Sequence, residues 1–207
     1  MFESLIAQGL VKQKRYENGL SVFKYAKRVF YEGLWNTDPL LLEARGMVLD
    51  DEGNKVIWPF TKVFNYGENG AGSNLISDTS VIAPRKVNGF MAACRFWKGE
   101  LIVSTTGSLD SDFAVLARSH IEKLDTERLL SRFTYIFEIC DSSDPHIVEE
   151  QEGAYLIGAR SMSSGNMVTE FYLDDIADRI GAKRPEVFYG TFGELWEQVK
   201  TCKHEGW

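Results

Sequence analysis

The chain has 207 residues, of which 44% are hydrophobic and 13% aromatic, and its formal net charge is -7. This composition predicts a packed globular protein with a single core and excludes a disordered polymer. The negative charge gives the whole protein no attraction to nucleic acid, so a polynucleotide would have to bind at a locally basic surface. Three widely spaced cysteines, without the close pairs of zinc sites or disulfide frameworks, predict reduced thiols and a cytoplasmic protein. The sequence contains no apolar run long enough to predict a membrane-spanning helix.

The first half of the chain predicts short strands, a loop, a hairpin and a helix. Residues 41–66 contain two β-patterned runs joined by the turn DDEG, with Pro59 marking a break. The loop GENGAGSN follows; it lacks the Gly-Lys-Ser/Thr ending of a phosphate-binding P-loop, so we interpret it as a turn. Residues 90–108 are predicted to form a hairpin that turns at 98–100. Residues 111–124 have helical spacing, with one apolar face formed by Phe113, Leu116, Ala117, Ile121 and Leu124.

The second half predicts two strands and two helices. The strands are FTYIFEIC and GAYLIGARSM. A helix is expected in YLDDIADRIG, with Gly181 as its C-cap, and another in TFGELWEQVK, where Thr191 and Glu194 have capping-box spacing. Strands come first and helices are inserted among them, so the order predicts an α+β fold with mostly antiparallel sheets and peripheral helices.

Four stretches put a charged side chain inside or at the end of an apolar strand, where an unpaired charge is costly. They are EARGMVLD with Glu43 and Arg45, FTKVFN with Lys62, RKVNGF with Lys86, and YIFEIC with Glu138. Each has a structural alternative, because alternate residues of a half-buried strand face water. Glu138 fits that alternative least, since its neighbours are apolar on both sides. If the three cations and this acid converge, they form a pocket for a polyanion that carries a hydroxylated group, such as a nucleoside triphosphate.

A series of short motifs in this sequence resembles that of the covalent nucleotidyltransferases. In order, they are Glu-x-Arg-Gly, Lys-x-Phe-Asn, Lys-x-Asn-Gly, a strand ending in Gly-Ser, Phe-Glu and Glu-Gly, and the match runs from about Leu41 to Trp207. It is most similar to the RNA ligases of phage and fungal tRNA repair. The resemblance implies a nucleotidyltransferase (ligase adenylation) fold and a single adenylyltransferase domain over residues 1–207, with residues 1–40 as its N-terminal lobe.

The resemblance also implies a three-step reaction that uses ATP and Mg²⁺ or Mn²⁺. Lys86 would attack the α-phosphate of ATP to form lysyl-AMP, the AMP would pass to an RNA 5′-phosphate, and a 3′-hydroxyl would displace it. Only a neutral amine attacks, and a free lysine has a pKa of about 10.4, so the site would have to disfavour the ammonium with nearby cations and metal. The implied partner is RNA with 5′-phosphate and 3′-hydroxyl ends, with tRNA as the RNA suggested by the relatives.

The other site residues are assigned only by this resemblance. Arg45 and Lys62 would supply positive charge to the phosphates. Asn88 and Glu138 would contact the ribose, and Glu205, in KHEGW, would help to position the divalent metal. The cofactor-binding set implied by the resemblance is therefore Arg45, Lys62, Asn88, Gly89 and Glu138.

The sequence departs from the family pattern at three points. Asn88 stands where the superfamily often has Asp, although fungal tRNA ligases look similar here. Thr106 stands where the family usually has a lysine before Gly-Ser, so a phosphate contact is lost or supplied by another group. The chain ends at Trp207, just after Glu-Gly, whereas the family continues through a further strand with paired lysines and usually another domain. This predicts either a fragment of a longer ligase or a shortened homologue; we favour a fragment that lacks this last core strand, because the break falls inside what should be a core strand.

Two other functions fit the same motifs. One is a nucleotide- or RNA-binding module that has the fold but cannot complete ligation. The other is a nucleotidyltransferase with a different acceptor, either DNA or an RNA cap.

Overall fold

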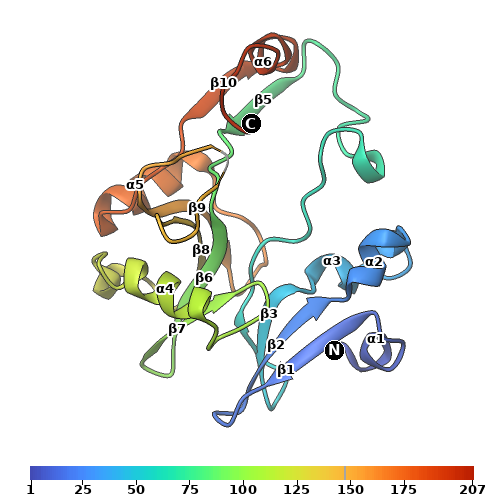
Figure 1. Cartoon of the computed structure of the whole chain (residues 1–207), viewed down its shortest axis with the longest axis vertical. Helices are drawn as coiled ribbons and strands as arrows, with labels where there is room; N and C mark the ends of the chain where they lie inside the picture. The colour runs from blue at the N-terminus through green and yellow to red at the C-terminus, as the bar shows by residue number, and fades with distance from the viewer. Residues whose placement is uncertain (147) are drawn as a thin grey trace.

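A computed structural model describes residues 1–146 and 148–207. Two four-stranded antiparallel sheets pack against each other (Figure 1). The first has the order β1 (Val11–Arg15), β2 (Leu20–Tyr25), β3 (Arg45–Asp50) and β4 (Lys55–Ile57). The second has the order β7 (Glu100–Thr105), β6 (Phe90–Trp97), β8 (Phe133–Cys140) and β9 (Gly153–Ser161).

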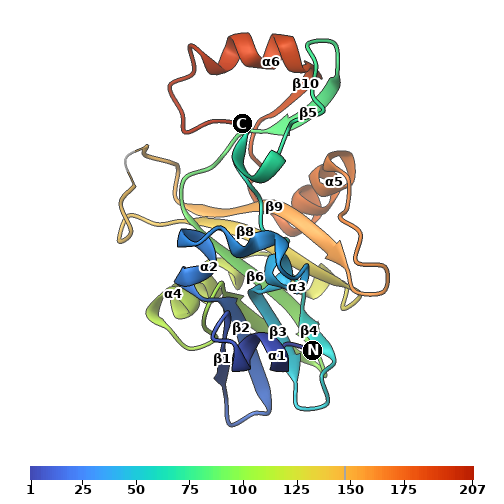
Figure 2. The same ribbon diagram turned by 90° about the vertical axis from the view of Figure 1, so that its right-hand side faces the viewer.

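Helices cover the outer faces of both sheets. Around the first sheet lie α1 (Glu3–Ala7), α2 (Lys27–Tyr31) and α3 (Leu40–Glu43). Against the second sheet lie α4 (Asp112–Ile121) and α5 (Glu170–Ile180). Figure 2 shows a smaller unit at one end, where β5 (Ser80–Pro84) pairs antiparallel with β10 (Val187–Thr191) beside α6 (Phe192–Val199). Single turns of 3-10 helix occupy Leu34–Asn36, Glu68–Gly70 and Thr126–Arg128.

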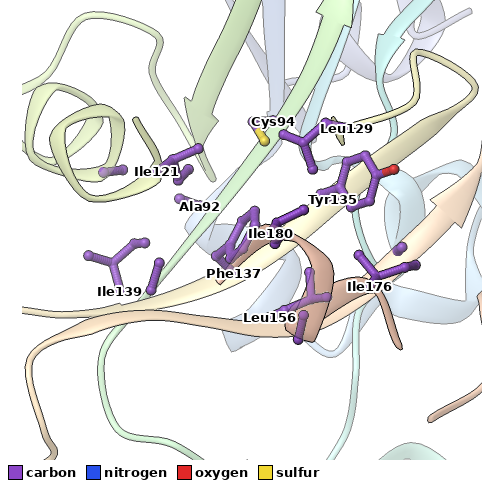
Figure 3. Close-up of a cluster of buried hydrophobic side chains, with 14 of the residues drawn as sticks. Ala92, Cys94, Ile121, Leu129, Tyr135, Phe137, Ile139, Leu156, Ile176 and Ile180 are labelled. Atoms are coloured by element: carbon purple, nitrogen blue, oxygen red, sulfur yellow. The ribbon is translucent and has the colours of Figure 1, made fainter. Parts of the chain in front are cut away.

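The second sheet is buried on both faces. On its outer face, Phe137 and Ile139 of β8 pack with Ile121, Ile176 and Ile180 of the two covering helices (Figure 3). On its inner face a smaller apolar cluster joins the two sheets, formed by Leu20, Val22, Val48, Val56, Ile57, Ala93 and Ile102. Burial on two faces explains why the sequences of β6 and β8 are almost continuously apolar.

The predicted fold class is confirmed, and most predicted elements lie where the patterns indicated. Strand β8 spans the whole of FTYIFEIC, and α5 ends at Gly181 in the left-handed conformation. The capping box is present, since Thr191 accepts from the Glu194 N–H while the Glu194 carboxylate accepts from the Thr191 N–H. Within the described part of the chain, no helix has the length and apolar character needed to cross a membrane.

Two sequence-based expectations are wrong in detail. Residues 58–65 have no regular secondary structure, so Lys62 lies in a connecting segment and not on a strand; Pro59 ends the pairing of β4, and the Lys62 N–H donates to the carbonyl of Leu42 at 2.7 Å. The buried face of α4 also differs, because Ala114, Ala117, His120 and Ile121 face the sheet while Phe113 is 46% exposed.

Candidate active site

Charged side chains replace apolar ones at one end of the space between the two sheets. On β2, Leu20 and Val22 belong to the inter-sheet cluster, and Lys24 follows two residues later. On β6, Ala93 belongs to the same cluster, and Met91, two residues before it, is the register partner of Glu138 on β8. Because side chains alternate along a strand, Lys24, Met91 and Glu138 face the same space as the cluster. The sandwich therefore has an apolar interior that ends in charged groups.

A β-bulge at Gly46 turns Arg45 toward this space. Met47 pairs with Phe23 and packs in the apolar cluster beneath the helices of the first sheet. Arg45 pairs with Lys24, the residue after Phe23, so Gly46 has no partner of its own and is the extra residue of the bulge. Gly46 has a φ of +89°, and a Cβ there would lie 2.9 Å from the Cα of Thr106. The extra residue shifts Arg45 to the opposite face from Met47, and its guanidinium lies 3.6 Å from the sulfur of Met91.

Glu43, the acid of the Glu-x-Arg-Gly motif, has a structural role. Its carboxylate receives two hydrogen bonds from Arg160 on β9, at 2.9 and 3.1 Å, and one from the Trp58 indole at 2.7 Å. Arg160 also donates to the carbonyls of Pro59 and Gly165, and its guanidinium lies over the Trp58 ring. This network ties the first sheet to the second, which fixes the sheet that carries Arg45.

The segment of residues 85–89, here called the lysine loop, connects β5 to β6 and has its backbone fixed. The N–H groups of Arg85 and Lys86 donate to the carbonyls of Glu186 and Gly206, at 2.7 and 2.8 Å. The Arg85 guanidinium makes two bonds, of 2.7 and 2.8 Å, to the carboxylate of Glu150, which is 7% exposed. The same carboxylate accepts the Asn88 N–H, and together these contacts hold the pKa of Glu150 below its usual value, the Arg85 bond most strongly.

Gly89 brings the lysine loop against β8. A Cβ at this position would lie 2.2 Å from the carbonyl oxygen of Ile139, so another residue would force the two strands apart. At this close approach the Gly89 N–H donates to the Glu138 carboxylate at 3.2 Å. The glycine of Lys-x-Asn-Gly thus couples the position of Lys86 to that of Glu138.

The environment of Glu138 changes its acidity. Burial raises the pKa of this carboxyl to about 7, although the Gly89 N–H and the charges of Lys86 and Arg45 favour the carboxylate. Perturbed acids of this kind gather at functional sites. Glu138, Gly89, Lys86 and Arg45 therefore belong to one electrostatic group.

Lys86 leaves the lysine loop toward solvent and meets Glu205. Its side chain is 54% exposed, and its Nζ lies 2.5 Å from a carboxylate oxygen of Glu205, itself 39% exposed. Glu205 was expected at a metal, and it lies directly beside the expected nucleophile. Among the described residues, a separate grouping of possible metal ligands is formed by His120, Asp141 and Glu152, where His120 and Asp141 already bond to each other at 2.7 Å.

Lys62 and Asn88 lie at the edges of this group. The Lys62 amine lies 4.5 Å from the centre of the Phe64 ring, and burial lowers its pKa, with the charge of Arg45 acting in the same direction. Lys62 is therefore a neighbour of Arg45. Asn88 lines a hollow of about 350 Å³ that also contains Cys140, Asp141 and Glu150.

Sequence reasoning missed the charge pairs that support the site. Arg85 and Glu150 are 65 positions apart, and Glu43 and Arg160 are 117 apart, so no local pattern links the partners. A partial signal exists for one pair, because Glu43 and Arg160 each stand beside apolar residues in the sequence, where a charge needs a partner.

The family comparison agrees with the motifs. A family model described as RNA ligase matches residues 43–206, which include Arg45, Lys62, the lysine loop, Glu138 and Glu205. The sequence matches none of the curated proteins with which it was compared.

Solved structures with a similar fold include an archaeal ATP-dependent RNA ligase in two forms. Form 2 has a TM-score of 0.65 at 14% identity, and form 1 has 0.58 at 15%. A candidate ATP-dependent DNA ligase from Aquifex aeolicus has 0.58 at 11%. Each alignment covers 96% of this chain but 53%, 52% and 53% of those chains, respectively, so the chain spans about half the length of these structures. At such low identity the likeness shows the ligase nucleotidyltransferase fold.

Proposed function

The chain belongs to the RNA ligase family, and from this we propose that residues 1–207 form a single adenylyltransferase domain of an ATP-dependent RNA ligase. Lys86 is the nucleophile. The observation that carries the proposal is the contact at Gly89, three residues after the exposed Lys86, where the Gly89 N–H donates to the partly buried Glu138 and that acid is influenced by the charges of Lys86 and Arg45.

The first step forms a bond between the Lys86 nitrogen and the α-phosphorus of ATP. The bond from that phosphorus to the bridging oxygen breaks and pyrophosphate leaves; the lysine ammonium gives one proton to solvent before the attack and one after it, so the nitrogen of lysyl-AMP keeps one hydrogen. An RNA 5′-phosphate oxygen then attacks the same phosphorus, which breaks the nitrogen–phosphorus bond and returns the lysine. A 3′-hydroxyl finally attacks the 5′-phosphorus and releases AMP. No redox change occurs at any step.

The surrounding residues bind and orient the nucleotide. Arg45 and Lys62 offer positive charge to the phosphates, with Arg45 able to bind two oxygens at once. Glu138 and Asn88 offer hydrogen bonds to ribose hydroxyls, while the bonds made by Arg85, Lys86, Asn88 and Gly89 fix the backbone from which the Lys86 side chain projects. Preorganised backbone of this kind lowers the reorganisation needed to reach an in-line geometry.

Glu205 suits a divalent cation. Its carboxylate is an exposed oxygen donor, and Mg²⁺ prefers such ligands and keeps several waters, so one protein carboxylate is enough. When bound, Mg²⁺ or Mn²⁺ would supply charge neutralisation at the phosphates. A salt bridge to Glu205 is made by an ammonium, which has no lone pair for attack, so cation binding by Glu205 would compete with that bridge and favour the reactive amine.

The proposed substrate follows from the RNA ligase family and from the resemblance of the motifs to those of tRNA-repair ligases. RNA is the expected partner, and we propose RNA with 5′-phosphate and 3′-hydroxyl ends, namely broken tRNA, because the motifs are most similar to those of tRNA-repair ligases. With the three cysteines free, we also propose a cytoplasmic location.

Incubation with Mg²⁺ and α-labelled ATP tests the proposal. The wild-type chain should acquire label that survives denaturation, while Lys86→Ala and Lys86→Arg should acquire none, because guanidinium is not nucleophilic at neutral pH. Lys123→Ala, which removes another exposed lysine, should label normally. Label retained by Lys86→Ala would disprove the assignment, and reversible ATP binding without label would favour a binding module.

The acceptor is tested separately with nicked substrates. Joining of broken tRNA without joining of nicked DNA supports the RNA assignment. Labelling by GTP in place of ATP would instead indicate a capping enzyme.

A further inference from the structure

A row of cations crosses the first sheet at the charged end of the sandwich. Lys12 on β1 is the register partner of Lys24 on β2, and Lys24 is the register partner of Arg45 on β3. Opposed residues on paired strands project from the same face, and neighbouring strands lie about 5 Å apart. Like charges directly opposite each other destabilise a sheet. The row Lys12–Lys24–Arg45 is therefore unfavourable unless an anion neutralises it.

No carboxylate of the described chain forms an ion pair with this row, although Arg45 acts on the nearby Glu138. None of the three side chains takes part in an ion pair across residues 1–146 and 148–207, whereas Lys14, two residues from Lys12 on the same strand, pairs with Asp110. Lys12 and Lys24 are exposed. The sheet thus presents three adjacent positive charges to whatever enters from solvent.

Lys24 also reaches across to the end of β7. A Cβ at Gly107 would lie 3.4 Å from the Lys24 Cδ and 3.8 Å from its Nζ, so the lysine stem rests against this glycine. Ser104 follows Ile102 on the inward face of β7, and its hydroxyl is buried without a hydrogen-bond partner among the described residues. The Lys24 amine and a glycine backbone therefore meet just after the end of the strand that carries this hydroxyl.

We infer that Lys24, flanked by Lys12, binds the β- and γ-phosphates of the nucleotide and so holds the pyrophosphate leaving group. The inference rests on the proposed function. Glu138, Arg45, Lys24 and Lys12 follow one another from β8 through β3 and β2 to β1. A nucleotide with its ribose at Glu138 and its α-phosphate at Lys86 would extend its remaining phosphates along the row. Lys24 then supplies positive charge beside Gly107, where the second sheet ends.

Equilibrium binding measurements can distinguish a specific contact of Lys24 with the outer phosphates from a general attraction between a positive surface and any nucleotide. The probes are α,β-methylene-ATP, which carries the outer phosphates but cannot release pyrophosphate, and AMP, which lacks them. In Mg²⁺, Lys24→Ala should bind α,β-methylene-ATP about 10-fold more weakly and AMP as tightly as wild type does. Lys24→Arg should keep most of the affinity, and the control Lys123→Ala should keep all of it. An equal loss for both probes, or no loss for either, would overturn the inference.

Kinetic measurements distinguish nucleotide from RNA phosphate. Lys24→Ala should need about 10-fold more ATP for half-maximal labelling and about 10-fold more pyrophosphate to reverse it, yet join pre-adenylated RNA at the wild-type rate. Slower joining of that RNA with unchanged binding of α,β-methylene-ATP would mean that Lys24 serves the RNA backbone, which contradicts the inference. If the wild-type chain binds the analogue but takes no label, the proposed nucleophile fails while the binding comparison still decides Lys24.

Discussion

The lysine loop and the cation row carry similar charges in opposite circumstances. In the loop, Arg85 is paired with a buried carboxylate, and the N–H groups of Arg85, Lys86, Asn88 and Gly89 each have a partner. In the row, Lys12 and Lys24 are exposed register partners, and neither forms an ion pair in the described chain. Paired charges here fix the backbone, and unpaired charges leave a surface that a polyanion can neutralise.

The same contrast appears within one motif. Glu43 and Arg45 are two residues apart, yet Glu43 is held by Arg160 in a network between the sheets, and the Gly46 bulge turns Arg45 toward Met91 in the space between the sheets. Glu43 therefore joins the sheets, whereas we propose that Arg45 binds the phosphates of the ligand.

Breaking the anchor of the lysine loop should have the largest effect on stability. Glu150→Ala removes a carboxylate that is 7% exposed and leaves the Arg85 guanidinium and the Asn88 N–H without their acceptor. We expect a loss of about 3 kcal/mol in the free energy of unfolding, measured by urea denaturation. Labelling with ATP should also fall at least about 10-fold, because the backbone that carries Lys86 is no longer held in place.

An exposed pair and a double variant serve as controls for this prediction. Glu32→Ala removes the partner of Arg28 in a pair that is half exposed, and should cost less than about 1 kcal/mol. The double variant Arg85→Met, Glu150→Met should recover part of the stability but not the labelling, since no unpaired charge remains but the loop is still unanchored. Equal costs for Glu150→Ala and Glu32→Ala would refute the contrast between anchored and exposed charges.

A pH series on Glu138 should give an effect of intermediate size. Its pKa of about 7 in the folded chain lies above the ordinary value of 4.5, so the folded state binds more protons than the unfolded state between these values. The protonated Glu138 carboxyl therefore makes its full contribution to the free energy of unfolding below about pH 4.5. This contribution decreases as the pH rises and is lost once the pH passes about 7. Glu138→Gln does not titrate, and its free energy of unfolding relative to that of wild type should increase by about 3 kcal/mol between these limits.

Denaturation of both proteins at several pH values measures this difference. A difference that stays constant with pH would show that Glu138 keeps an ordinary pKa. The stability of Glu138→Gln relative to wild type should be higher at pH 8 than at pH 5. The variant should nevertheless bind ATP more weakly than wild type at pH 8, because the amide lacks the charge of the carboxylate.

Local sequence rules predicted the elements better than the contacts between them. The capping box of Thr191 and Glu194 and the whole of β8 depend on residues close in sequence, and both are present as expected. The side on which Arg45 projects depends on one extra residue at Gly46, and a period of two cannot reveal a bulge.

Residues of the site were predictable only where a motif carried them. The motifs indicated Lys86 and Glu138, and the structure links them through Gly89. Lys24 belongs to none of the motifs, and only the strand register brings it beside Arg45. The apolar neighbours of Lys62 predict a strand, but Lys62 lies in a connecting segment, where its amine lies near the rings of Phe64 and the distant Trp35.

The smallest predicted effect is a gain in stability from shortening the cation row. Lys12→Ser removes the repulsion between Lys12 and Lys24 and should raise the free energy of unfolding by a few tenths of a kcal/mol. Lys14→Ser, on the same strand, removes a lysine paired with Asp110 and should not stabilise the chain. Because exposed charges are screened, the gain from Lys12→Ser should be larger at low salt than in 0.5 M NaCl, and excess pyrophosphate should abolish it by neutralising the row of the wild-type chain. A gain that persists unchanged with salt and pyrophosphate would come from β-propensity instead of charge, and the row would then have no electrostatic cost for a ligand to relieve.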